Sequence, residues 1–214
     1  MDPYNSIEKI LILAPHTDDG ELGCGGFISK SIEANKEIHY IAFSKCEASV
    51  PEGYPKDILA KELYQALSVL GIMEENIRLL DYPVRQFPSF RQDILERLVR
   101  IANELKPDLV VMPNSRDVHQ DHQTIYEEGL RAFKRTRIIG YELPWNNFIS
   151  LHNMYVLLED RHVQTKIRSL SKYESQNHRI YFSKGFIESL AHTRGIQFGK
   201  SHYAECFEMI RWYL

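Results

Sequence analysis

The stretch LILAPHTDDGELGCGG, residues 11–26, joins an apolar segment to a His, two adjacent Asp and a glycine-rich turn. A continuous apolar run that ends at a proline is typical of a buried strand, and a glycine-rich turn often leads into a helix. Two neighbouring carboxylates repel each other, so a fold either exposes such a pair or gives it a cation to share. The stretch therefore predicts a buried strand whose end carries a site of chemical interest.

The alternation of strand-like and helix-like segments continues along the chain. Apolar periodicity and turn residues predict strands over residues 9–15, 37–44, 76–82, 108–113, 137–143, 153–159 and 203–213. The same signals predict helices over residues 20–35, 54–70, 89–105, 122–134, 162–175 and 185–194. This order predicts a Rossmann-like α/β fold, with a mostly parallel β-sheet flanked by helices on both faces.

Length and composition favour one domain. The chain has 214 residues, of which 43% are hydrophobic, so it can bury a full core. It contains no internal repeat, low-complexity tract or Gly/Ser linker. We therefore expect a single domain over residues 1–214, in which the less regular part from about residue 140 caps the candidate active site.

Charge and cysteine content restrict the partners and the compartment. Lys and Arg number 26 against 29 Asp and Glu, so there is no basic excess with which to bind nucleic acid. Cys24, Cys46 and Cys206 are widely separated and form no CxxC pair, which favours reduced thiols in a cytoplasmic protein. No apolar run is long enough for a signal peptide or a membrane span. We expect a cytoplasmic protein with neither nucleic acid nor membrane as partner.

Two loops rich in His and Asp follow predicted strands. PHTDDGELG follows LILA, and PNSRDVHQDH follows LVVM. In open parallel sheets, ligands bind beyond the carboxyl ends of the strands, so we expect adjacent strands to bring these loops together. The side chains concerned are His16, Asp18 and Asp19 in the first loop and Asp117, His119, Asp121 and His122 in the second.

These residue types suit a divalent metal ion. A catalytic zinc ion usually has three imidazole or carboxylate ligands and keeps one position open, a description that His16, Asp19 and His122 meet. Asp18 and His119 are then free to transfer protons or stabilise charge beside the ion, with Asp121 steadying His119.

The two loops carry a family resemblance. APHTDDGELGCGG resembles the AHPDD-x-x-LGCGG signature of the LmbE/PIG-L family of metal-dependent N-deacetylases, and DVHQDH resembles the second motif of that family, D-x-H-x-D-H. Further similar segments are AKELYQALSVLGI, KIRSLSKYESQ, RGIQFG and YAECFE. The similarity covers nearly the whole chain.

The resemblance implies a function and a role for each site residue. It implies that His16, Asp19 and His122 bind Zn²⁺, with Fe²⁺ or another divalent ion as the alternative. It further implies that Asp18 is the general base and that His119 stabilises the oxyanion. The expected reaction is removal of an N-acetyl group from a small-molecule amino sugar or its conjugate. Family members often form homo-oligomers, so a trimer or hexamer is expected.

The chain departs from the family pattern at two places. The family often carries a substrate-binding Arg just before the Glu of the segment after the second strand, where this chain reads PKDILAKE and offers only Lys56 and Lys61. Thr17 replaces the usual Pro between His16 and Asp18, which changes backbone stiffness and leaves the metal-binding and proton-transfer positions intact.

Other interpretations stay open for several residues. An Asp pair alone is more often a helix cap or a solvated turn. Tyr141, Trp145 and Phe148 suit either an aromatic wall for a sugar ring or the core, and Arg194 suits either an anionic ligand or a structural ion pair. The glycines of LGCGG are expected to let a helix approach the sheet closely.

Two rival functions remain at this stage. One is a metal-dependent hydrolase of a non-sugar amide, because the motifs contain metal-binding and proton-transfer residues and nothing that specifies the substrate. The other is a non-catalytic metal-binding module that keeps the fold.

Overall fold

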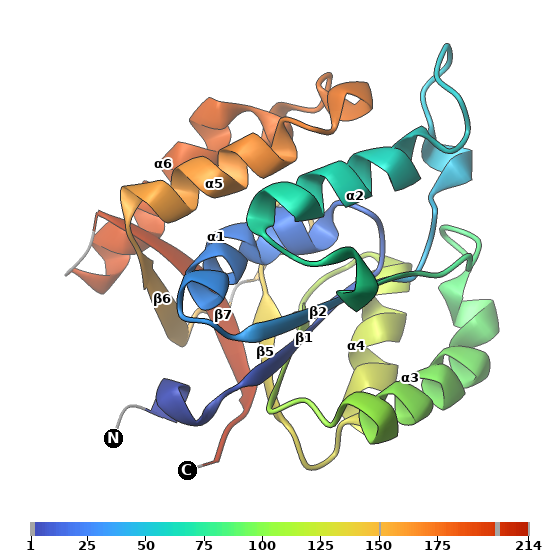
Figure 1. Cartoon of the computed structure of the whole chain (residues 1–214), viewed down its shortest axis with the longest axis horizontal. Coiled ribbons are helices and arrows are strands. Elements are labelled where there is room, and N and C mark those ends of the chain that lie inside the picture. Colours follow the sequence, from blue (N-terminus) through green and yellow to red (C-terminus); the bar gives the residue numbers. More distant parts are fainter. Residues whose placement is uncertain (1–2, 150, 200–201, 214) are drawn as a thin grey trace.

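A mixed β-sheet forms the centre of the molecule (Figure 1). Seven strands build it within residues 3–149, 151–199 and 202–213, the residues described by this computed structural model. The strands are β1 (Lys9–Ala14), β2 (Glu37–Ala42), β3 (Ile77–Leu79), β4 (Leu109–Pro113), β5 (Arg137–Tyr141), β6 (Met154–Leu158) and β7 (Tyr203–Arg211). Their spatial order is β3-β2-β1-β4-β5-β7-β6. Neighbours from β3 to β5 run parallel, and β7 is antiparallel to both β5 and β6.

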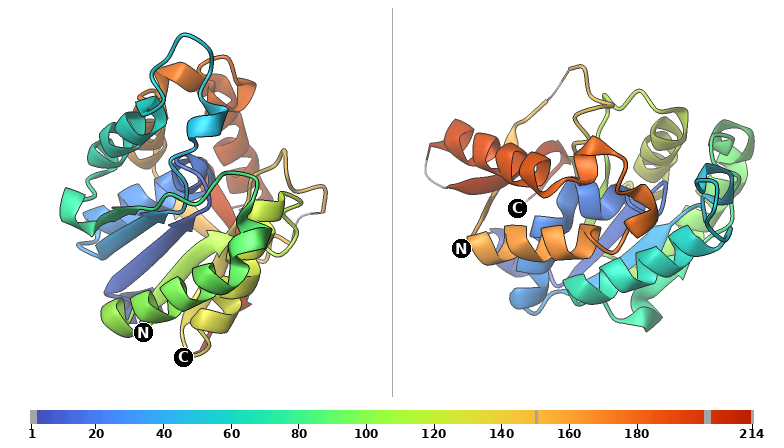
Figure 2. Two further views of the ribbon diagram at one scale, coloured as in Figure 1. Left: turned by 90° about the vertical axis from the view of Figure 1, so that its right-hand side faces the viewer. Right: turned by 90° about the horizontal axis from the view of Figure 1, so that it is seen from above.

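Helices cover both faces of this sheet (Figure 2). The helices are α1 (Asp19–Glu33), α2 (Ile58–Leu70), α3 (Arg91–Leu105), α4 (Gln120–Ala132), α5 (Asp160–Leu170) and α6 (Lys184–Phe198). Short 3-10 turns lie at Pro3–Ser6, Glu47–Ser49, Glu74–Asn76, Phe87–Phe90, Glu174–Gln176 and Ile180–Phe182. Helices α1, α2 and α5 contact one another on one face, and α3 contacts α4 on the other.

Alternate residues of β1 pack into different cores, as the period of a strand requires. Ile10 and Ile12 lie in the core that includes Phe27 of α1 and Leu63 of α2. Leu11 and Leu13 lie in the core that includes Leu98 of α3 and Ile125 of α4. Burial on both faces explains the continuous apolar run of β1. The predicted Rossmann-like α/β architecture is confirmed.

Several helix boundaries differ from the prediction by two to five residues, and two of the larger differences have a visible cause. Helix α2 begins at Ile58 rather than at residue 54, because turns around Pro55 precede it. Helix α5 ends at Leu170 rather than at residue 175. The Glu62 carboxylate accepts hydrogen bonds from the Ser175 backbone N–H (2.8 Å) and hydroxyl (2.6 Å). These tertiary bonds hold the chain after α5 in a tight turn instead of a continued helix.

Helix α1 approaches the sheet closely at its glycines, as the LGCGG motif predicts. A Cβ atom on Gly23 would lie 2.3 Å from Cδ2 of Tyr141, and one on Gly26 would lie 2.5 Å from Cδ1 of Leu158. The helix is also kinked here, since Cys24 has non-helical backbone angles of φ −146° and ψ 26°. The close contact fixes how α1 sits on β5 and β6.

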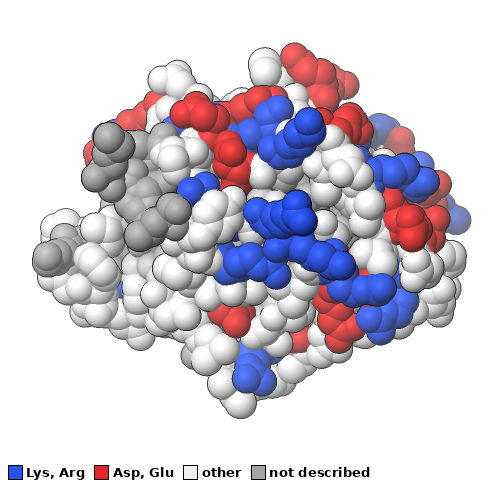
Figure 3. All heavy atoms as spheres, turned by 90° about the horizontal axis from the view of Figure 1, so that it is seen from below, with Lys and Arg blue, Asp and Glu red and all other residues white. Residues whose placement is uncertain are grey.

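Charged side chains are distributed unevenly over the surface. On the face seen from below in Figure 3, Lys and Arg gather in the middle and Asp and Glu lie around them. Within the described residues, none of the helices has the length and apolar composition needed to cross a membrane.

Substitution of Gly23 by Ala is expected to lower the free energy of unfolding by about 1–3 kcal/mol, because the new methyl group overlaps the Tyr141 ring. Urea denaturation followed by circular dichroism measures this change. Gly185→Ala is the matched control, since no atom lies within 4 Å of its added Cβ. Equal stability of the two variants would contradict the close packing of α1.

Candidate functional site

The sheet order brings the two His- and Asp-rich loops together. Strands β1 and β4 are adjacent and parallel, with Ile10 opposite Leu109 and Ile12 opposite Val111. Their carboxyl ends therefore meet at one edge of the sheet, where α1 begins after the first loop and α4 after the second. This is the kind of position at which open α/β sheets bind ligands.

Three donor atoms converge between these loops. His16 Nδ1 lies 3.1 Å from Asp19 Oδ2 and 3.2 Å from His122 Nε2, and the Asp19 and His122 atoms are 3.1 Å apart. Tetrahedral zinc with bonds of about 2.0–2.1 Å places neighbouring ligand atoms about 3.3 Å from one another. The three side chains thus form a nearly equilateral face that fits a small divalent cation.

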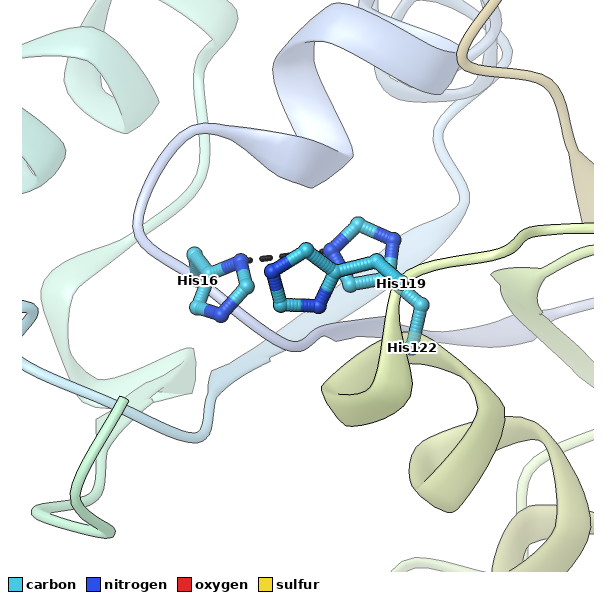
Figure 4. A group of neighbouring side chains, drawn as sticks. All are labelled: His16, His119 and His122. Atoms are coloured by element: carbon cyan, nitrogen blue, oxygen red, sulfur yellow. Dashed lines mark hydrogen bonds between the residues drawn. The ribbon is translucent and has the colours of Figure 1, made fainter. Parts of the chain in front are cut away.

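His119 lies beside this triangle but is set differently. Ligand atoms of His16, His119 and His122 all fall within 4.8 Å of one another, and the three rings gather at the head of α4 (Figure 4). However, His119 Nδ1 accepts a hydrogen bond from the Asp121 backbone N–H at 3.2 Å. The shorter distances favour Asp19, not His119, as the third donor to an ion.

Two buried carboxylates orient the imidazole rings of the triangle. Asp121 Oδ2 lies 3.0 Å from His16 Nε2, and Asp117 Oδ2 lies 2.7 Å from His122 Nδ1. Each carboxylate engages the nitrogen that faces away from the centre, so His16 Nδ1 and His122 Nε2 keep their lone pairs for an ion. Such outer partners are typical of metal-binding histidines.

Asp121 is placed differently from the sequence-based expectation. The expectation had Asp121 steadying His119, but its carboxylate bonds His16 and only its backbone N–H contacts His119. The carboxylate also accepts the backbone N–H groups of Arg85 (2.5 Å) and Phe87 (3.1 Å). Asp121 therefore joins the first loop, the Arg85 segment and α4 in one network.

The charges of the triangle depend on one another. Burial alone would raise the pKa of Asp19, but the His122 and His16 rings outweigh burial and hold it well below its usual value. For His122 the effect of burial has the opposite sign and alone would lower the pKa of the ring, yet the Asp19 and Asp117 carboxylates raise it to about 10. In the absence of an ion, protons therefore balance the negative charge of this site, and a bound cation would replace them.

Asp18 faces the same space without being part of the triangle. It is the N-cap residue of α1, but its side chain makes no capping hydrogen bond and lines the cavity in front of the triangle. Burial, followed by repulsion from Asp19, raises the pKa of Asp18 to about 6. A carboxylate with a pKa near neutrality suits a general base.

His119 is a neutral hydrogen-bond donor at physiological pH. Burial and the neighbouring His122 and His16 rings lower its pKa to about 4. Because its Nδ1 accepts the Asp121 N–H, the ring proton resides on Nε2. A neutral N–H donor beside a cation site suits stabilisation of a developing oxyanion.

A cavity of about 280 Å³ opens in front of these groups. Its wall includes Trp145, which stacks on Tyr181 with ring centroids 4.0 Å apart. Of the other aromatic candidates, Tyr141 is buried in the core at 1% exposure, and Phe148 is 82% exposed and outside the lining. Only Trp145 of the three therefore stands in the cavity wall.

The cavity also contains residues that sequence patterns did not single out. Lys61, one of the two lysines expected near the substrate, is exposed and pairs with Asp57, whereas Leu59, two residues before it, lines the cavity. The cavity wall instead holds Arg179, which lies on the irregular segment after α5. Arg194 forms two hydrogen bonds to Glu142, each 2.8 Å, which confirms the structural ion pair.

Comparisons with known proteins find relatives in both sequence and fold. Residues 11–133 match the family model described as GlcNAc-PI de-N-acetylase, PIG-L. A diacetylchitobiose deacetylase of Thermococcus kodakarensis is 23% identical over 197 residues, which cover 82% of this chain and 72% of the relative.

Solved structures show the same fold. The N,N'-diacetylchitobiose deacetylase of Pyrococcus horikoshii aligns with a TM-score of 0.82 at 20% identity, covering 97% of this chain and 85% of that one. The 4-carboxy-2-hydroxymuconate hydratase GalB of Pseudomonas putida KT2440 aligns with a TM-score of 0.79 at 17% identity, covering 97% and 98%. The fold alone therefore does not determine the reaction.

Asp117→Asn is expected to weaken Zn²⁺ binding by about 10- to 100-fold, because His122 loses the carboxylate that orients its ring while every donor of the triangle remains. Competition with a chromogenic chelator measures the affinity. Glu96→Gln, on the exposed face of α3, is the charge-matched control and should bind as the wild type does. Unchanged affinity in Asp117→Asn would argue against this ligand arrangement.

Proposed function

Because the chain belongs to the GlcNAc-PI de-N-acetylase (PIG-L) family, we propose that it is a zinc-dependent deacetylase that hydrolyses the acetamido group of an N-acetylated amino sugar or its conjugate. The observation that carries this proposal is the triangle of His16, Asp19 and His122 donors with Asp18 and His119 beside it. The amino-sugar substrate is supported by the names of the matched family and of the diacetylchitobiose deacetylases.

His16, Asp19 and His122 would hold the ion, for which Zn²⁺ is the first choice and Fe²⁺ or another divalent ion the alternative. When bound, such an ion activates water and polarises a carbonyl oxygen. The chain contributes the orientation of the donors through Asp117 and Asp121.

Asp18 serves as the general base. Its carboxylate lines the cavity next to Asp19 and is not consumed by a capping bond, so it can accept a proton from the attacking water. The same carboxyl group can then give this proton to the amide nitrogen as the C–N bond breaks, so that the amine leaves in its neutral form. Acetate and the free amino sugar complete the reaction.

His119 acts on the other side of the reacting carbonyl. Its Nε2–H donates to the oxygen on which negative charge develops, and the Asp121 backbone N–H fixes the ring that carries this donor. The contribution of Asp121 is indirect, through His16 and His119, so Asp121 is a positioning residue.

The remaining features of the proposed enzyme follow from the fold and the family. We propose a single domain over residues 1–214, because β6 and β7 extend the sheet begun by β1. The part from about residue 140 caps the site, since it contributes Trp145, Arg179 and Tyr181 to the cavity wall. Cytoplasmic location and a homo-oligomer, a trimer or hexamer, are proposed from the sequence and the family resemblance.

Purified protein loaded with Zn²⁺ is expected to release acetate from N-acetylglucosamine conjugates, to stop after chelation and to recover when Zn²⁺ is restored. Enzyme-coupled acetate detection measures this. N-acetylated amino acids serve as the comparison for a hydrolase of non-sugar amides. Acetate release that is indifferent to chelation would contradict the proposal, and so would metal binding without release from any of these amides.

Asp18→Asn is expected to retain the ion while turnover falls by about 10²- to 10⁴-fold, because the variant keeps the three donors and loses the proton acceptor. Metal content and acetate release are measured on the same sample. Asp57→Asn, which alters an exposed carboxylate paired with Lys61, is the matched control. Near-normal turnover of Asp18→Asn would remove Asp18 from its assigned role.

A further inference from the structure

Arg179 is a half-buried cation in the cavity wall without a carboxylate partner. Its Nη1 donates to the Tyr181 hydroxyl. Within the part of the chain that is described, no Asp or Glu oxygen lies close enough to form an ion pair with it, and Asp18 and Asp19 attract it only across the cavity. Arg194, another arginine of intermediate exposure, is by contrast paired with both oxygens of Glu142. Arginines removed from water normally acquire such a partner. The exception at Arg179 points to a partner that arrives with the ligand.

The guanidinium group is held in place by aromatic rings. It lies 5.8 Å from the centroid of the Tyr181 ring, and that ring stacks on Trp145 at an interplanar angle of 14°. All three residues line the cavity that contains Asp18, His16 and His122. A fixed guanidinium fork loses little conformational entropy when it binds an oxyanion, and its geometry matches phosphate and carboxylate groups.

The charge of the cavity favours the same kind of ligand. The cavity lining holds two guanidinium groups, those of Arg85 and Arg179, beside the carboxylates of Asp18 and Asp19. The Arg85 side chain donates to the carbonyl oxygen of Ala48 at 3.2 Å. A divalent ion at the proposed site would neutralise the carboxylates around it, so the charge of Arg179 stays available for an anionic group on the ligand.

We infer that Arg179 is a specificity-determining residue that binds a negatively charged group, a phosphate or a carboxylate, carried by the amino sugar close to its acetamido group. The inference rests on the proposed deacetylation and narrows its substrate class from amino sugars in general to anionic ones. The residues that carry it, Arg179, Tyr181 and Trp145, lie outside residues 11–133, the region that matches the family model.

The test compares anionic and neutral substrates in matched variants. Initial rates give kcat/KM for N-acetylglucosamine 1-phosphate, N-acetylglucosamine 6-phosphate, N-acetylmuramic acid and the neutral methyl glycoside of N-acetylglucosamine. The enzymes are the wild type, Arg179→Gln, Arg179→Lys and, as control, Arg168→Gln, which alters an exposed arginine of α5 outside the cavity. The two sugar phosphates and the lactyl carboxylate of N-acetylmuramic acid differ in the kind of anion and in its position on the sugar. Comparing them shows which anion the Arg179 guanidinium group binds, and at which position.

In the wild type, at least one anionic substrate should exceed the methyl glycoside in kcat/KM. Arg179→Gln should reduce that value by about tenfold to hundredfold, the usual effect of losing a hydrogen bond to a charged group. The methyl glycoside should lose a clearly smaller factor, since it lacks the anion. Arg179→Lys should retain part of the preference, and Arg168→Gln should retain all of it. Equal losses for charged and neutral substrates, or none for either, would overturn the inference.

A binding measurement separates this inference from the proposed function. Calorimetry on the Zn²⁺-loaded protein compares glucosamine 6-phosphate with methyl glucosaminide, in the wild type and in Arg179→Gln. Acetate release without any Arg179-dependent preference overturns the inference and leaves the deacetylase proposal standing. Arg179-dependent binding of the sugar phosphate without turnover of any substrate overturns the deacetylase proposal and leaves the anion site standing. Anion binding that persists in Arg179→Gln overturns the assignment to Arg179.

Discussion

The geometry of the site depends on two carboxylates that lie just outside its triangle of donor atoms. Asp117 and Asp121 are buried, and each bonds the outer nitrogen of an imidazole ring, His122 in one case and His16 in the other. Without these carboxylates both imidazole rings could turn. The lone pairs of His16 Nδ1 and His122 Nε2 would then no longer point to the space that they share with the Asp19 carboxylate. Because Asp121 also accepts backbone N–H groups from Arg85 and Phe87, the ring of His16 is fixed by a segment remote from both motif loops. The donors are thus organised before any ion binds, which lowers the cost of binding one.

The sequence predicts the frame of this site well because its signals are local. Strands β1 and β4 are buried on both faces, so each consists of a continuous apolar run. Such a run predicts a parallel strand from its own sequence, whichever strands lie beside it. His16 and Asp19 follow β1 directly, and His122 lies in the first turn of α4, so placing the strands side by side is enough to bring the three together. The glycines of α1 also predict its close approach to the sheet, because only a residue without a side chain permits the contact with Tyr141.

The parts that escaped prediction depend on tertiary contacts. Arg179 and Tyr181 lie on an irregular segment with no period and no motif, and only the folded chain shows that this segment returns to the cavity. The end of α5 is set by Glu62, a residue of α2 more than a hundred positions from its partner Ser175. The role of Asp121 depends on the direction of its side chain. His119 is close to it in sequence, yet the Asp121 carboxylate bonds His16 of the other loop. Spacing identifies the residues but not which of two nearby partners each one bonds.

The two helices that begin at the site favour negative charge in the cavity. Helix α1 starts at Asp19 and α4 at Gln120, so the positive ends of both helix dipoles flank the cavity. Each contributes only about 0.3–1 kcal/mol, which is less than the paired charges that shift the pKa of His122 to about 10. The ion pairs therefore decide which groups of the triangle are protonated, while the helix ends favour negative charge in the space in front of it.

His119 adds a hydrogen-bond donor to that space. Burial and two neighbouring rings lower its pKa to about 4, so the ring is neutral and does not repel the proposed ion. In the proposed reaction, negative charge that forms on a carbonyl oxygen there would meet one N–H donor and two helix termini, while Arg179 would bind the charge that the proposed substrate already carries.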